Sequence, residues 1–198
     1  KMTDTAYLDT KAVDEWLSAN LTGYQGPSEA QKFAGGQSNP TFRIGAKSGN
    51  YVLRRKPPGV LLKSAHAVDR EFRVQGALKD TAVPVAEMHV LCEDDKVIGS
   101  TFYIMDMING RNFDDPRLPD LSFEDRKPVI EEMNRVLAAI HNVDIVKAGL
   151  NDFGPEGNYY RRQTDRWTKQ YRTSETERLE DMDALIVWLE SNIPEDDG

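Results

Sequence analysis

The order in which strand patterns and helix patterns follow one another constrains the fold of this chain most strongly. After one amphipathic stretch over about 10–20, short alternating runs and tight turns occupy residues 31–105, interrupted by a helical pattern over 64–79. From Ser122 onward, apolar residues recur only at helical spacing. Strands gathered first and helices afterwards favour an α+β fold over a parallel doubly wound sheet.

The strand patterns and their turns indicate one antiparallel lobe. Three predicted strands follow one another through tight turns, and two more form a hairpin through the acidic turn 93–96. The predicted strands cover residues 31–34, 41–44, 51–54, 86–91 and 97–105. We therefore predict a five-stranded antiparallel lobe over residues 1–109, with residues 110–198 beginning a helical lobe.

Two patterns in the second half predict where its helices lie. A helix from Ser122 carries an apolar stripe, and Ser174-x-x-Glu177 is a capping-box pattern that opens a last helix. The stripe consists of Val129, Met133, Val136, Leu137 and Ile140. Between these helices, the basic and aromatic segment 159–171 forms either a solvated helix face or a contact surface for an acidic substrate or partner.

Composition excludes several classes of protein. The single cysteine, Cys92, cannot form an internal disulfide, which favours a reducing compartment, and we expect the protein to be cytoplasmic. Apolar runs end long before the roughly eighteen residues that span a bilayer, so we expect no membrane partner. The net charge of −8, from 25 Lys and Arg against 33 Asp and Glu, argues against non-specific nucleic-acid binding.

The acidic charge is unevenly distributed along the chain. Residues 43–73 carry eight basic side chains against only Asp69 and Glu71. Such a segment is either a solvated face or a site for an anionic ligand. A nucleic-acid partner is the least favoured interpretation, and it would predict salt-dependent retention of DNA.

Three features between residues 35 and 71 together indicate a phosphate-binding site. Gly35-Gly36 lies between two predicted strands, and without a Cβ its backbone N–H groups can approach an anion, although a simple hairpin turn has the same pattern. Arg54 places a cation on the third strand. Glu71 lies on the inward stripe of the next helix, where a carboxylate is costly to bury unless a cation meets it. This combination is typical of the nucleotide lobe of kinases.

Six blocks of sequence carry a family resemblance. They cover Phe33–Phe42, Tyr51–Gly59, Ser64–Arg73, Leu137–Asp144, Gly149–Tyr160 and Arg162–Trp167. The first four closely resemble the aminoglycoside phosphotransferase/choline kinase-like superfamily. The last two are similar to the branch whose kinase-like domain is fused, in some animals, to an acyl-CoA dehydrogenase. The resemblance runs from about Phe33 to Trp188 and implies a protein-kinase-like fold.

The resemblance also implies a site for the nucleotide phosphates. The loop that covers them would consist of Gly35, Gly36, Gln37, Ser38 and Asn39. Arg54 would contact the phosphates where most kinases have lysine, as is usual in this branch, and Glu71 would be its ion-pair partner.

The segment 102–109 is implied to be the linker between lobes, against which adenine binds. Met105 would line the adenine pocket. The Asp106 carbonyl would accept a hydrogen bond from the adenine amino group, and the Ile108 N–H would donate one to the ring. ATP and Mg²⁺ are the cofactors that the resemblance implies.

The catalytic loop of the family, His-x-Asp-x-x-x-x-Asn, has no match in this chain. None of its three histidines, His66, His89 and His141, has Asp two residues later. We expect that loop after Gly198, which would make the chain the front part of a longer kinase with neither catalytic residues nor metal ligands of its own. Asp152-Phe153-Gly154 spells the metal-binding triplet of protein kinases, but it precedes the expected loop.

We therefore predict an ATP- and Mg²⁺-dependent phosphotransferase that acts on a hydroxyl of a small metabolite. The fusion to acyl-CoA dehydrogenases in relatives favours a hydroxy acid or its CoA thioester as acceptor. The alternative is a non-catalytic nucleotide-binding module, a pseudokinase that senses or scaffolds.

Overall fold

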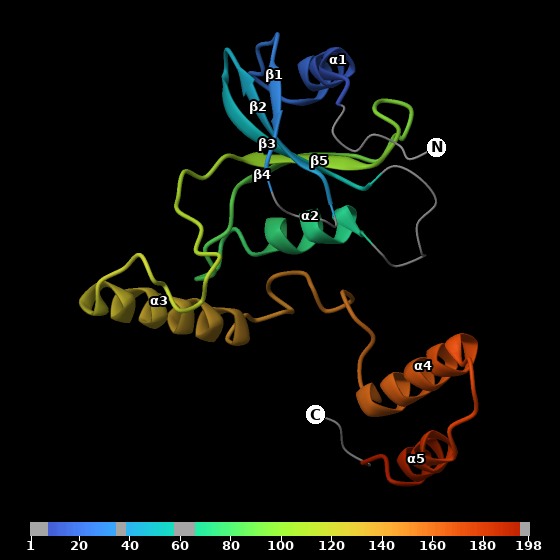
Figure 1. Ribbon diagram of the computed structural model, residues 1–198. Helices are drawn as coiled ribbons and strands as arrows, with labels where there is room; N and C mark the ends of the chain where they lie inside the picture. Colours follow the sequence, from blue (N-terminus) through green and yellow to red (C-terminus); the bar gives the residue numbers. More distant parts are fainter. Residues whose placement is uncertain (1–7, 35–38, 58–65, 195–198) are drawn as a thin grey trace. The chain divides into compact units, whose positions relative to one another are not determined.

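Five antiparallel strands form one sheet with the order β1-β2-β3-β5-β4 (Figure 1). The strands are β1 (Glu29–Lys32), β2 (Thr41–Ala46), β3 (Gly49–Arg55), β4 (Met88–Cys92) and β5 (Phe102–Asp106). Because β5 inserts between β3 and β4, it is an interior strand that pairs on both sides. The predicted five-stranded antiparallel sheet of an α+β fold is confirmed.

The computed structural model describes residues 8–34, 39–57 and 66–194. The chain divides into two compact units, a first unit of residues 1–150 and a C-terminal unit of residues 151–198. The first unit contains the sheet and three helices, and the C-terminal unit contains two helices.

Helix α1 (Thr10–Asn20) covers one face of the sheet, as the amphipathic stretch over 10–20 predicts. The Asp9 side chain caps it by accepting a hydrogen bond from the Ala12 N–H at 3.0 Å. Its buried side chains pack on apolar residues of the central strands, and the Trp16 ring meets the edge of Phe102 at 5.1 Å between centroids. The fully buried members of this core include Val13, Leu17, Phe42, Ile44, Leu53, Phe102 and Ile104.

Helix α2 (Val68–Ala77) lies on the opposite face of the sheet (Figure 1). It is shorter than the predicted helix over 64–79. His66 has a φ of 63°, which the helix cannot include, so the helix begins two residues later. The first two positions of the predicted helix, residues 64 and 65, fall outside the described residues. Phe72 anchors the helix against the Tyr103 ring at 5.9 Å between centroids.

The predicted start of the fifth strand at residue 97 is wrong. Residues 94–99 instead form tight turns, in which the Val97 N–H donates to the Asp94 carbonyl and the Gly99 N–H to the Asp95 carbonyl. Gly99 has a φ of 81°, a conformation that glycine adopts without a steric penalty. The fifth strand accordingly starts after these turns, at Phe102.

Helix α3 (Phe123–His141) begins after Ser122, whose hydroxyl accepts from the Asp125 N–H at 3.1 Å. The predicted apolar stripe is present on this helix but is largely exposed, with Met133 62% and Leu137 51% accessible. Periodicity therefore predicts the helix correctly, whereas its burial depends on what packs against it.

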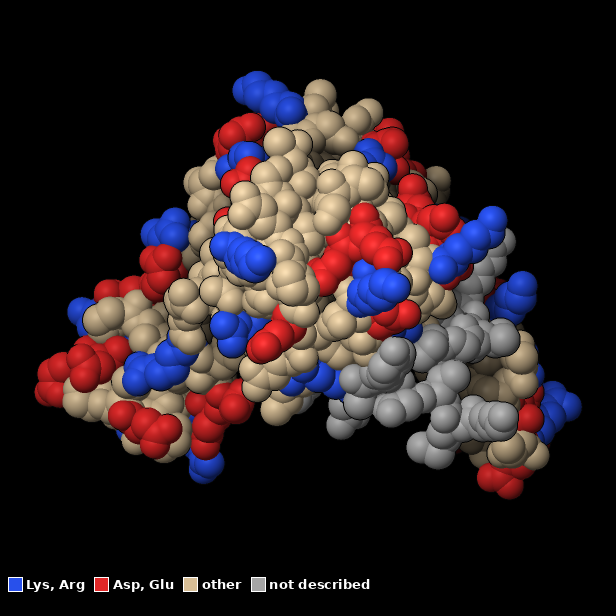
Figure 2. Space-filling view, turned by 90° about the horizontal axis from the view of Figure 1, so that it is seen from above, with Lys and Arg blue, Asp and Glu red and all other residues tan. Residues whose placement is uncertain are grey.

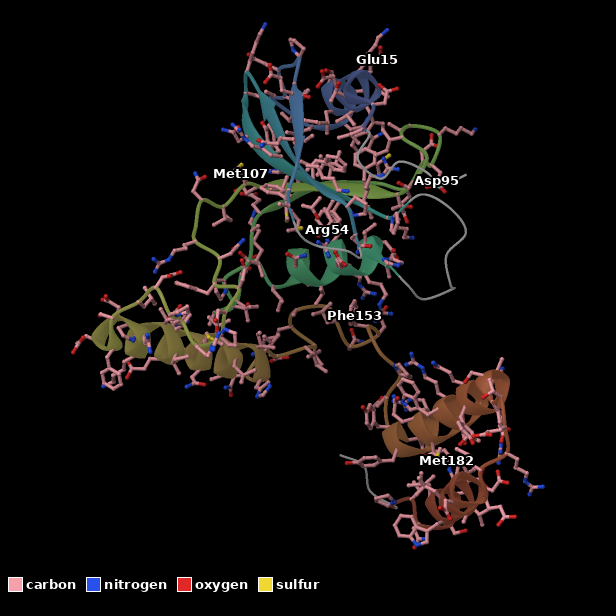
Figure 3. The ribbon with its side chains drawn as sticks, in the orientation of Figure 1. Glu15, Arg54, Asp95, Met107, Phe153 and Met182 are labelled. Atoms are coloured by element: carbon pink, nitrogen blue, oxygen red, sulfur yellow. The ribbon has the colours of Figure 1, made fainter. Side chains whose placement is uncertain are left out.

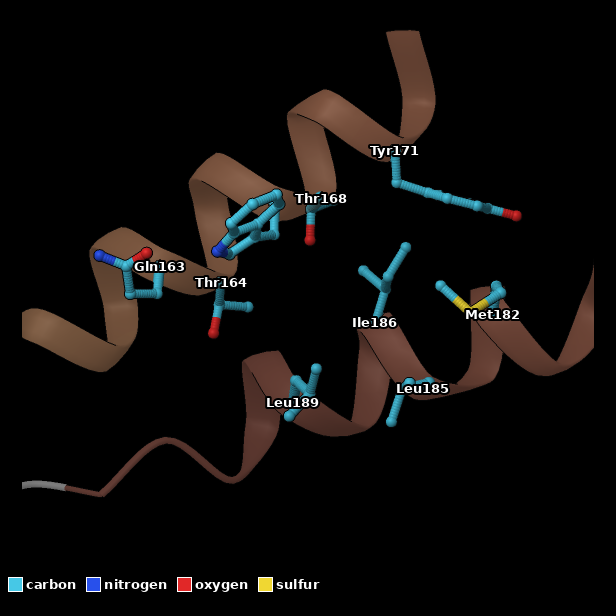
Figure 4. A pocket seen from close by; sticks show the side chains of 9 residues that line it. Gln163, Thr164, Thr168, Tyr171, Met182, Leu185, Ile186 and Leu189 are labelled. Carbon is cyan, nitrogen blue, oxygen red and sulfur yellow. The ribbon is translucent and has the colours of Figure 1, made fainter. Parts of the chain in front are cut away.

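In the C-terminal unit, α4 (Tyr159–Ser174) and α5 (Glu180–Ser191) pack against each other. The predicted capping box at Ser174 is wrong. Ser174 ends α4, and its hydroxyl donates back to the Gln170 carbonyl at 3.0 Å, so it does not cap the next helix. Figure 4 shows an apolar pocket between the two helices, where Ile186 of α5 faces Tyr171 of α4.

Candidate functional site

A cation and a carboxylate meet between the sheet and α2. Arg54 of β3 donates through Nε to Oε2 of Glu71 on α2 at 2.7 Å, and through Nη1 to the Thr41 hydroxyl at 3.2 Å. Figure 3 shows Arg54 between the sheet and that helix. The structure thus brings together the third-strand cation and the inward glutamate that the sequence singles out.

Strand register explains why these side chains share one face. Arg54 lies opposite Thr41 on β2 and opposite Tyr103 on β5, and directly paired residues point to the same side of a sheet. Glu71 accepts from the Tyr103 hydroxyl at 3.2 Å and from the Asn39 amide Nδ2 at 2.9 Å. Tyr103 of one strand and the loop residue Asn39 therefore hold the Glu71 carboxylate that in turn holds Arg54.

Tyr103 is a buried partner of this ion pair. Burial away from solvent is the main cause that raises the pKa of Tyr103 to about 12, and the negative charge of Glu71 is the second. The phenol thus stays protonated at neutral pH and remains a hydrogen-bond donor. Its role as a third support of Glu71 was not anticipated from the sequence, although pairing of the third and fifth strands would have predicted that it lies opposite Arg54.

The same sheet face continues toward the predicted adenine pocket. Val52 lies two residues before Arg54 on β3, and it pairs with Met105 of β5. Val52 is buried and Met105 is half-buried. The structure therefore places Met105 on the face that carries Arg54, opposite the apolar residue Val52, which the sequence pattern alone did not single out. The two-residue period of the strand is the signal that could have found it.

Asp106 and Ile108 lie at the end of β5 and in the segment that follows it. The Asp106 N–H donates to the Glu87 carbonyl at 2.9 Å, and its carboxylate contacts His89 Nε2 at 2.7 Å. The Ile108 side chain is 68% exposed. Their backbone contacts to adenine stay predictions.

Of the predicted phosphate loop, Gly35, Gly36, Gln37 and Ser38 lie outside the described residues. Asn39 is described and is only 3% exposed. Both ends of its amide are engaged within the protein, since Nδ2 reaches Glu71 and Oδ1 meets His66 Nδ1 at 2.8 Å. The Asn39 side chain therefore supports the ion pair, a role that the sequence analysis did not foresee.

Several of the described charged residues along 43–73 have local partners. Besides the Arg54–Glu71 pair, Lys56 lies 3.4 Å from Asp69, Arg43 bonds the Asn50 amide oxygen at 2.8 Å, and Arg73 donates to the Gly149 carbonyl. Figure 2 shows Lys and Arg intermixed with Asp and Glu over the face that it draws. The partners of Lys56, Arg43 and Arg73 are all within the part of the chain that the structure describes, which favours a solvated face over a nucleic-acid site for these three cations.

The described residues contain no cluster of three or more His, Cys, Asp or Glu side chains that could hold a metal ion. Asp144, just after the end of α3, is engaged by Lys147, whose backbone N–H donates to the Asp144 Oδ1 at 3.0 Å.

No helix among the described residues is long and apolar enough to cross a membrane.

An antiparallel five-stranded sheet whose third-strand cation pairs with a glutamate on the following helix is typical of the N-terminal lobe of the protein-kinase-like fold. The family model described as "Phosphotransferase enzyme family" matches residues 29–198. The chain belongs to this phosphotransferase family.

Two named proteins, one from a plant and one from a mouse, are similar to this chain in sequence. The chain is 45% identical to an Arabidopsis thaliana protein named "Probable acyl-CoA dehydrogenase IBR3" and 43% identical to acyl-CoA dehydrogenase family member 10 of Mus musculus, over 96% of its own length in each case. It spans only 24% and 18% of those two proteins.

A solved structure is also similar. It is a crystal structure of a "putative aminoglycoside phosphotransferase" from Ralstonia eutropha JMP134, with 46% identity and a TM-score of 0.77. The match covers 96% of this chain and 55% of that one. The kinase-like fold, with only part of the helical lobe, is thereby shown.

Proposed function

We propose that this chain supplies the nucleotide site of an ATP- and Mg²⁺-dependent phosphotransferase that acts on a hydroxyl of a small metabolite. The observation that carries the proposal is the Arg54–Glu71 ion pair beneath the sheet. Family membership supports a phosphotransferase in general, and the pair supports a specific place for the nucleotide phosphates.

The ion pair prepares Arg54 for an anionic ligand. Glu71 engages Nε and Thr41 engages Nη1, so the guanidinium is fixed in orientation before a ligand arrives. Arg54 and Glu71 keep 31% and 33% of their side-chain surface exposed, which leaves the guanidinium accessible to a phosphate oxygen. Arginine presents five N–H donors in a planar fork that suits phosphate.

Residues farther along this face suit a purine. Val52 and Met105 offer apolar contact to a flat ring, and the backbone from Asp106 to Ile108 offers hydrogen-bonding groups at its edge. Mg²⁺, when bound with ATP, would supply neutralising charge for phosphoryl transfer. Its ligands and the catalytic aspartate are expected outside the described residues.

A hydroxy acid or a hydroxyacyl-CoA thioester is the acceptor that we propose. The names of two relatives support it, because proteins named as acyl-CoA dehydrogenases are among those that resemble this chain. The alternative is a nucleotide-binding module without turnover.

Calorimetric titration with MgATP tests the proposal. Arg54→Ala should weaken binding by roughly 10- to 100-fold, because it removes charge-assisted hydrogen bonds to phosphate. Lys11→Ala, which removes an exposed cation from α1 on the other side of the sheet, is the control and should bind as the wild type does. Equal affinities in all three proteins would refute the site.

Turnover is measured separately, as ATP consumption with panels of hydroxy acids and hydroxyacyl-CoA thioesters. Acceptor-dependent consumption supports the phosphotransferase. Binding of MgATP with no consumption on either panel favours the nucleotide-binding module instead.

A further inference from the structure

The Arg54–Glu71 pair rests on a second layer of hydrogen bonds that begins at His66. His66 Nδ1 lies 2.8 Å from Asn39 Oδ1, and Asn39 Nδ2 lies 2.9 Å from Glu71 Oε1. Asn39 precedes β2 and His66 precedes α2, so the two residues link the starts of both elements.

The direction of each bond follows from chemistry. Asn39 Nδ2 must donate to Glu71, because a carboxylate can only accept. The other end of the amide, Oδ1, is then an acceptor, so His66 Nδ1 must carry a hydrogen. The geometry thus assigns the Nδ1–H form to neutral His66.

This chain of bonds fixes both oxygens of the Glu71 carboxylate. Oε2 accepts from Arg54 Nε and Tyr103, whereas Oε1 has Asn39 at 2.9 Å and only a long 3.5 Å contact from Arg54 Nη2. Without the Asn39 amide, the carboxylate could rotate away from its alignment with the guanidinium. Asn39 is nearly fully buried, so its amide cannot be replaced readily by solvent.

We propose that Asn39 and His66 are positioning residues for nucleotide binding: His66 orients the Asn39 amide, which orients Glu71 and thereby Arg54. This inference rests on the proposed function. Neither side chain contacts the ligand itself; both act by keeping the guanidinium in place.

Two substitutions at His66 separate the hydrogen bond from the backbone requirement. His66 has a φ of 63°, which glycine and asparagine both tolerate. His66→Asn keeps an N–H donor on the atom bonded to Cγ, where histidine has Nδ1, whereas His66→Gly has no donor. We expect His66→Gly to weaken MgATP binding by about tenfold and His66→Asn to restore affinity to within about twofold of the wild type.

Histidine ring ¹⁵N NMR at mildly alkaline pH gives a readout that does not depend on nucleotide. The His66 signals are identified by their loss in His66→Asn. In the wild type we expect the Nδ1–H form, and in Asn39→Ala a shift toward the Nε2–H form, because the acceptor is gone.

The outcomes distinguish the inference from the proposed function. An Nε2–H form of His66 in the wild type, or equal MgATP affinity of His66→Gly and His66→Asn, overturns the positioning role. A wild-type chain that binds no MgATP overturns the proposed function, whatever form His66 takes.

Discussion

The sheet and helix α3 both carry regular apolar patterns, yet they differ in what those patterns bury. Phe42, Phe102 and Ile104 of the sheet are at most 1% exposed, whereas Met133 and Leu137 of α3 are more than half exposed. The sheet has α1 on one face and α2 on the other, so its side chains are enclosed within the first unit. An apolar period therefore specifies an element, while its partners decide how much stability it contributes.

The largest expected effect contrasts two phenylalanines. Phe102→Ala should lower the free energy of unfolding by about 3–5 kcal/mol, because Phe102 is fully buried beneath Trp16. Phe123→Ala, at a side chain that is 82% exposed on α3, should change it by less than about 1 kcal/mol. Urea unfolding followed by circular dichroism measures both, and similar losses would contradict the contrast.

The second prediction uses the pH dependence of Tyr103. Its folded-state pKa, about 12, lies above the usual 10, so its stabilisation is complete below pH 10 and is lost as pH rises toward 12. The wild type should lose about 2 kcal/mol more than Tyr103→Phe across this interval, since one pKa unit corresponds to about 1.4 kcal/mol. Unfolding in urea at successive pH values tests this, and parallel curves would show that Tyr103 does not hold its proton in the fold.

A third prediction compares an ion pair between the sheet and a helix with an exposed ion pair on one helix. Glu71→Gln should lower the free energy of unfolding by about 1–2 kcal/mol, because the Glu71 carboxylate also accepts hydrogen bonds from Asn39 and Tyr103. Glu132→Gln breaks the exposed Arg135 pair on α3 and should have no measurable effect. Thermal unfolding at low and high salt distinguishes them, and a loss at Glu132 equal to that at Glu71 would refute the difference.

The smallest effect concerns the uncapped start of α5. Leu179 is its N-cap and provides no side-chain hydrogen bond. Leu179→Ser should stabilise the C-terminal unit by about 0.5–1 kcal/mol, because a hydroxyl can accept from a free N–H of the first turn. Hydrogen exchange of the amides in α5 reports it, with Leu179→Ala as the control without an acceptor. Faster exchange in the serine variant would contradict the prediction.

Sequence reasoning predicted the sheet and most helices because their signals are local. The alternation around Phe42 and Ile44 and the stripe of α1 need no knowledge of the rest of the chain. The failures involve competition between local signals. Ser174 fits a capping box, but its hydroxyl bonds backwards to Gln170 within α4. Val97 fits a strand, but the turns that end at Gly99 exclude it.

At the candidate site, the ion pair was within reach of the sequence but its supports were not. The sequence indicates Glu71 because it is a charged residue on the apolar stripe of a predicted helix. It indicates Arg54 because that residue is a cation on a predicted strand. The contributions of Tyr103 and Asn39 depend on strand order and on the direction of an amide, which are long-range properties. The predicted lobe boundary at residue 110 and the roles of Asp106 and Ile108 stay predictions.

The insertion of β5 between β3 and β4 has a consequence for how the protein folds. Arg54 and Tyr103 become neighbours only after the chain has closed the long loop that contains α2 and β4, which is slow compared with forming a hairpin. The early β2–β3 hairpin brings Arg54 to Thr41 but not to Tyr103. We therefore expect the site to assemble late in folding, so that a nascent or partly unfolded chain would not yet hold the fully supported ion pair.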